Sequence, residues 1–145
     1  DGIDIYFLNR MVVRNVTDSS QVVGLFNSPP AGTTPLCQTL RVVLNEKKAI
    51  AKEKKLLIII FTDGEPDNCD SGETGAKTLG KILKLERTPR NNMFTTMGAV
   101  TDDDGAVGYL NEYDKKIKNV DTVDDDANES KEIKTTKTTT AGRRS

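Results

Sequence analysis

The sequence predicts an α/β fold in which an open, mostly parallel sheet carries helices on both faces. Short runs of β-branched and aliphatic residues alternate along the chain with segments in which apolar residues repeat at helical spacing. The run at residues 56–61 is apolar throughout, which is typical of a strand buried on both faces of a parallel sheet. Strands that alternate with helices indicate right-handed crossovers and a Rossmann-like arrangement.

Five segments of the chain are predicted to form strands. Residues 3–8 carry β-branched and aromatic side chains, and residues 11–16 have the pattern of a second, edge strand. Residues 93–100 and 120–123 form two later strands, the last one short. Because the apolar run at residues 56–61 suits a strand buried on both faces, we expect it at the centre of the fold.

Three helices are predicted between these strands. The helix before the central strand is the best marked, because Thr34 can cap its start and Pro35 suits its first position. Its apolar residues share one face: Leu36, Leu40, Val43, Leu44 and Ile50. Apolar residues also repeat at helical spacing from Ala76 to Leu83 and from Val107 to Ile117.

Size and composition indicate one domain with a modest aliphatic core. The chain has 145 residues, of which 35% are hydrophobic and 30% charged, and its formal net charge is −1. This balance provides no general field for nucleic acid or an anionic membrane. No stretch approaches the roughly 18 apolar residues of a membrane span. We therefore expect a cytoplasmic protein without nucleic-acid or membrane partners.

The two cysteines, Cys37 and Cys69, are expected to be free thiols. They form no Cys-x-x-Cys pair, and the chain has no His that could complete a zinc site.

The end of the chain has a different composition from the rest. Residues 121–130 are acidic, whereas residues 131–145 are basic and rich in Thr. Such low-complexity sequence is typical of disorder, so residues 127–145 are predicted to form a disordered tail. The alternatives are a tail that meets an acidic partner or one that folds back on the acidic run.

Polar loops follow the predicted strands at the end of the sheet where ligands usually bind. Residues 62–67, Thr-Asp-Gly-Glu-Pro-Asp, follow the central strand, and residues 101–105, Thr-Asp-Asp-Asp-Gly, follow the next one. Residues 32–36, Gly-Thr-Thr-Pro-Leu, begin the helix that leads into the central strand. Carboxylates and hydroxyls without His or Cys suit a hard ion such as Mg²⁺.

These loops resemble those of the von Willebrand factor A (vWA) family, in which they build a metal-ion-dependent adhesion site (MIDAS). The most specific match is LLIIIFTDGEP at residues 56–66, and GTTPL at residues 32–36 is similar to the family's Gly-Gly-Thr-Pro-Leu. The resemblance covers residues 1–126. It implies that Thr34 occupies the position of the family's metal-coordinating Thr. Asp63 likewise occupies the position of the acidic residue that often reaches the metal through water.

One departure from the family concerns the main metal ligands. The family's first strand ends in Asp-x-Ser-x-Ser, and no such motif occurs here. By this alignment the domain is partial and truncated at the N-terminus, because the chain begins at the family's second strand. Thr34 and Asp63 alone offer few ligands, so we expect weak or incomplete Mg²⁺ binding.

Each of these residues also has a plainer interpretation. Thr34 with Pro35 is a common helix start, Asp63-Gly64 a common turn, and Asp102–Asp104 a common solvated loop.

The resemblance favours a protein-binding module over an enzyme. We expect a protein partner that engages the loop end through an acidic side chain at the metal, and self-association through open sheet edges. The alternatives are a Mg²⁺-dependent phosphoryl-transfer or hydrolase-like enzyme and a structural fragment that binds nothing. The chain has neither a Gly-rich phosphate loop nor a His for a Ser/His or Cys/His pair.

Overall fold

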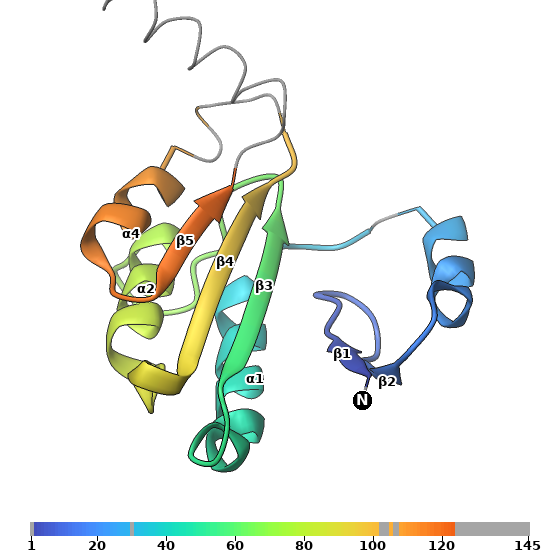
Figure 1. Cartoon of the computed structure of the whole chain (residues 1–145). Helices are drawn as coiled ribbons and strands as arrows, with labels where there is room; N and C mark the ends of the chain where they lie inside the picture. The colour runs from blue at the N-terminus through green and yellow to red at the C-terminus, as the bar shows by residue number, and fades with distance from the viewer. Residues whose placement is uncertain (1, 30, 102–104, 106–107, 124–145) are drawn as a thin grey trace, which may run out of the picture.

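The computed structural model describes residues 2–29, 31–101, 105 and 108–123, which form two separate sheets (Figure 1). β1 (Ile3–Ile5) and β2 (Val13–Val16) form an antiparallel hairpin. β3 (Leu56–Thr62), β4 (Met93–Ala99) and β5 (Val120–Val123) form a parallel sheet in that order. The predicted tail at residues 127–145 and the three consecutive Asp residues at 102–104 lie outside the described residues.

Helices occupy the predicted places between the strands. α1 (Leu36–Ala51) leads into β3, α2 (Gly75–Lys81) continues into a π-helical turn, η3 (Ile82–Glu86), and α4 (Leu110–Lys116) leads into β5. Short 3₁₀ turns complete the described elements: η1 (Ser19–Gln21), η2 (Val23–Asn27) and η4 (Arg90–Asn92). The predicted α/β fold with a parallel sheet is confirmed at this level.

α1 begins one residue later than a Thr34 cap requires. Its N-cap is Pro35, which makes no side-chain capping bond. The Leu36 amide instead donates to the Thr34 carbonyl at 2.8 Å. The capping interpretation of Thr34 is therefore wrong, because a capping side chain belongs to the residue directly before the first helical one.

The core lies between one face of the parallel sheet and the helices. β3 and β4 pair over seven residues, from Leu56 opposite Met93 to Thr62 opposite Ala99. Since side chains alternate across a strand, every second residue of β4 points to the helices. The helix-facing side chains Met93 and Met97 are fully buried there, against Leu79 and Leu83 in the same cluster.

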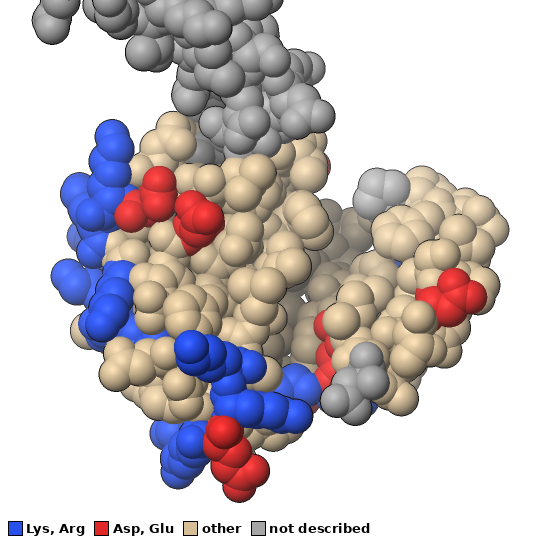
Figure 2. All heavy atoms as spheres, viewed as in Figure 1, with Lys and Arg blue, Asp and Glu red and all other residues tan. Residues whose placement is uncertain are grey.

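The opposite face of β3 is open, which contradicts the prediction of helices on both faces and a strand buried on both. Leu57, Ile59 and Phe61 are 62%, 54% and 70% exposed. Figure 2 views this side and shows mostly uncharged surface over the sheet, with Lys and Arg gathered towards the rim. The reason is topological. Each strand in the order β3-β4-β5 is added on the same side of the previous one, so right-handed crossovers place all the connecting helices on one face of the sheet. Helices would cover the opposite face only if the strand order reversed direction.

The first two strands are shorter than predicted and do not pair with β3. Their register shifts between Ile3 and Ile5, and Asn15 within β2 has a φ of 55°. The hairpin lies beside α1 and apart from β3 (Figure 1). As a result, β3 is an edge strand of its sheet rather than the centre that the apolar run predicted.

Among the helices of the described residues, none combines the length and apolar character that crossing a bilayer requires.

Candidate functional site

The candidate site lies where β3 ends, at the carboxyl end of the parallel sheet. The strand continues to Thr62, whose carbonyl accepts a hydrogen bond from the Val100 amide at 3.0 Å. This bond holds the exits of β3 and β4 together. The loop at residues 62–67, which we call the acidic loop, therefore starts from a fixed point.

Reciprocal hydrogen bonds join the acidic loop to the start of α1. The Thr34 amide donates to Asp67 Oδ2 at 3.0 Å, and the Asp67 amide donates to the Thr34 carbonyl at 3.0 Å. Thr34 and Asp67 are 33 residues apart in the chain. The predicted convergence of residues 32–36 and 62–67 is thus present in the structure.

The turn of the acidic loop is held by hydroxyl groups. The buried Thr62 hydroxyl donates to the Gly64 carbonyl at 2.9 Å, and the Tyr109 hydroxyl donates to the same carbonyl at 2.9 Å. Burial raises the pKa of Tyr109 to about 12, so the phenol keeps its proton and acts as a donor at neutral pH. Tyr109 connects the segment before α4 to the acidic loop.

The far end of the loop packs against the start of α2. A Cβ on Gly75 would lie 1.8 Å from the Pro66 carbonyl oxygen, so only glycine fits this approach. The Gly75 amide also donates to Asn68 Oδ1 at 2.7 Å. The acidic loop is therefore fixed at both ends.

Several polar groups of the site have no partner among the residues that the structure describes. Thr34 is half-buried and Asp63 is exposed. Neither the Thr34 hydroxyl nor the Asp63 carboxylate forms a hydrogen bond or ion pair with any residue that the structure describes. These two groups, which the sequence singled out, are available to a ligand, as are the exposed Thr33 hydroxyl and Glu65 carboxylate.

Asp67 and Tyr109 belong to the site but were not predicted as site residues. Asp67 stands in the same acidic loop as Asp63, which is a weak signal, since the sequence does not show which carboxylate turns inward. Tyr109 carries no loop motif, and its role depends on a contact with Gly64 across 45 residues.

The residues present do not make a complete magnesium site. Mg²⁺ demands six oxygen ligands in near-octahedral order. Thr34 and Asp63 provide two side chains, and the Asp67 carboxylate already accepts from the Thr34 amide. Across residues 2–29, 31–101, 105 and 108–123, no three acidic or cysteine side chains are grouped so as to hold a metal ion. Thr34 and Asp63 therefore supply fewer side-chain ligands than Mg²⁺ requires.

Comparisons with protein-family models, with curated proteins and with solved structures give no match to this chain.

Proposed function

We propose that this chain is a protein-binding module of the vWA type, which engages its partner at the carboxyl end of β3. The supporting observation is the reciprocal pair of hydrogen bonds between Thr34 and Asp67, at 3.0 Å each. This pair presents the Thr34 hydroxyl beside a fixed loop that carries the exposed Asp63 carboxylate. A preorganised polar surface of this kind binds a partner with little loss of loop entropy.

Binding is favoured over catalysis by the chemistry of the side chains. The chain contains no His, so neither a Ser/His nor a Cys/His nucleophile pair can form. The free polar groups of the site are hydroxyls and carboxylates, which act as hydrogen-bonding groups or as oxygen ligands. We therefore propose no catalytic residue.

Magnesium plays a supporting part in this proposal. Thr34 and Asp63 are the side chains of this chain that would hold the ion, and the remaining positions would be filled by water and by a carboxylate of the partner. Affinity for Mg²⁺ alone is expected to be on the order of millimolar or weaker, because most of the ion's ligands would be water.

The proposal is tested by nuclear magnetic resonance of the full chain, titrated with Mg²⁺ and then with a short peptide that carries one Glu. We expect the backbone amide signals of residues 32–36 and 62–67 to move, with saturation only at millimolar peptide. Asp63→Ala should abolish these changes. Asp114→Ala is the matched control, because Asp114 is also exposed but lies on α4.

Two results would contradict the proposal. Changes that persist in Asp63→Ala would place the binding surface elsewhere. The absence of any change at several tens of millimolar peptide and Mg²⁺ would favour a structural fragment that binds nothing.

A further inference from the structure

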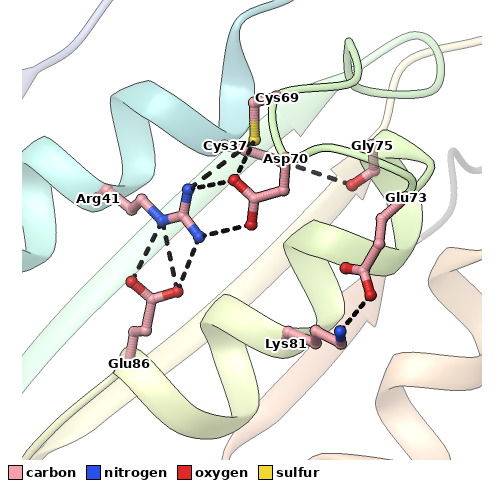
Figure 3. Close-up of polar contacts among 8 residues, drawn as sticks. All are labelled: Cys37, Arg41, Cys69, Asp70, Glu73, Gly75, Lys81 and Glu86. Atoms are coloured by element: carbon pink, nitrogen blue, oxygen red, sulfur yellow. Dashed lines mark hydrogen bonds and ion pairs between the residues drawn. The ribbon is translucent and has the colours of Figure 1, made fainter.

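The two cysteines, far apart in the sequence, meet between α1 and the loop before α2 (Figure 3). Cys37 belongs to the first turn of α1 and is completely buried, whereas Cys69 is half-buried. Both are free thiols, as the sequence predicted. The Cys37 thiol lies beside that of Cys69 and donates to the Gly75 carbonyl, with its sulfur 3.5 Å from the oxygen.

Arg41 of α1 holds the segment before α2, which carries Cys69 and Asp70, in place. Its guanidinium donates to both carboxylate oxygens of Asp70 at 3.0 Å and to Glu86 at 3.1 to 3.3 Å. One of its nitrogens, Nη1, is also 4.0 Å from the Cys69 sulfur (Figure 3). One side chain of α1 thus fixes the loop and places a positive charge beside a thiol.

We propose that Cys69 and Cys37 are an oxidation site, at which a peroxide converts the thiol pair into a disulfide that locks the acidic loop to α1. This inference is independent of partner binding, because it depends on the two thiols and Arg41 alone.

The surroundings assign a different role to each thiol. Cys69 is the group that a small oxidant can reach, because it is only half-buried. Its sulfur lies 4.0 Å from Arg41 Nη1 and 3.7 Å from Asp70 Oδ1, to which the thiol donates. Cys37 has no exposed surface, and burial together with the adjacent Cys69 thiol raises its pKa to about 12. Cys37 therefore stays protonated and unreactive until its neighbour has been oxidised.

The reaction proceeds in two balanced steps. The Cys69 thiolate attacks one oxygen of hydrogen peroxide, the O–O bond breaks, and the released hydroxide takes a proton to leave as water. This step forms a sulfenic acid on Cys69. The Cys37 sulfur then attacks the Cys69 sulfur, the S–O bond breaks, and the leaving hydroxide takes the Cys37 proton as a second water. Both sulfurs are oxidised by one electron each, and the peroxide is reduced.

The disulfide would act directly on the candidate site. Cys37 stands three residues after Thr34, and Cys69 two residues after Asp67, the pair that joins the two segments. A covalent bond here would remove the opening motion that separates α1 from the loop. The oxidised protein would then open this site less often than the reduced protein, in which hydrogen bonds alone hold the loop.

The test treats the full chain with hydrogen peroxide and maps its peptides by mass spectrometry without reduction. We expect a Cys37–Cys69 linked peptide within one chain, which dithiothreitol removes. In Cys37→Ala, Cys69 should instead accumulate as a sulfenic acid that dimedone traps. In Cys69→Ala, Cys37 should resist peroxide. Conversion to a sulfinic acid without a linked peptide, or linkage between two chains, would overturn the proposal.

Two further measurements examine the mechanism without relying on the cysteine variants. Arg41→Gln should slow formation of the linked peptide, because it removes the ion pairs to Asp70 and Glu86 that hold the segment with Cys69 beside α1. Arg14→Gln, which removes another ion-paired Arg, should not change it. Amide hydrogen exchange of residues 67–75 should slow by about tenfold or more in the oxidised wild-type chain, since cross-links restrict opening. Equal rates for the two Arg variants, or unchanged exchange, would contradict the proposed roles.

Discussion

The hairpin and the parallel sheet are held in the molecule by different forces. In the sheet, residues from β4 and from α2 with its π-helical turn are completely buried, among them Met93, Met97 and Leu79. In the hairpin segment, Ile3 is 65% exposed and Met11 is 89% exposed. The sheet with its helices is stabilised by a continuous apolar core, to which the hairpin segment contributes the half-buried Leu8.

Most of the contacts that attach the hairpin to α1 are polar. Asp4 forms an ion pair with Lys47 at 2.5 Å, and Tyr6 and Arg14 both bond to Glu46. Such pairs are partly solvated and contribute little each. This difference teaches that global stability depends on the sheet, whereas the hairpin can open on its own at lower cost.

The largest expected effect is on the free energy of unfolding, which should respond very differently to the loss of Arg87 beside the parallel sheet and of Arg14 in the hairpin. Arg87 has no exposed surface and donates to the carbonyls of Leu83, Met93, Lys118 and Asn119. Arg87→Ala would leave these carbonyls without their donor, so we expect a loss of at least about 3 kcal/mol in the free energy of unfolding. Arg14→Ala in the hairpin should change this free energy little. Urea unfolding measures both, and similar losses would show that the hairpin is part of the cooperative core.

A smaller effect is expected on local opening. Lys47→Gln removes the partner of Asp4, so amide exchange of residues 3–16 should quicken roughly two- to fivefold while β4 is unchanged. Lys48→Gln is the matched control, because the neighbouring Lys48 forms no ion pair with any described residue. If exchange in β4 quickens equally under Lys47→Gln, the hairpin does not open separately.

The smallest effect is the response of the hairpin to acid. The hydrogen bond from Lys47, with that from the Asn15 amide, lowers the pKa of Asp4 below its ordinary 3.8. A lowered pKa in the folded state stabilises the hairpin at pH values above 3.8, and this contribution is lost as the pH falls through the folded value. Chemical shifts of the hairpin should therefore report opening only below about pH 4, and Asp4→Asn should remove this dependence. Opening that begins near pH 6 would point to another group.

The local pattern of the sequence by itself determined the parallel strands and the helices between them. The continuous apolar run that becomes β3 (Leu56–Thr62) is long enough to specify a strand. The apolar repeat within Leu36–Ala51 specifies a helix, since only the helical period places its apolar residues on one face. The sequence also indicated that residues 32–36 and 62–67 converge, because carboxyl ends of parallel strands share one edge. Its assignment of Thr34 and Asp63 as ligands remains a prediction.

Only the tertiary structure decided which surfaces and groups meet. An apolar run has the same composition whether one face or both are covered, so the open side of β3 follows from strand order and crossover hand. The contacts of Asp67 with Thr34, and of Cys69 with Cys37, join residues that are distant in the chain. No local periodicity encodes such contacts, because they depend on how completed elements pack against one another.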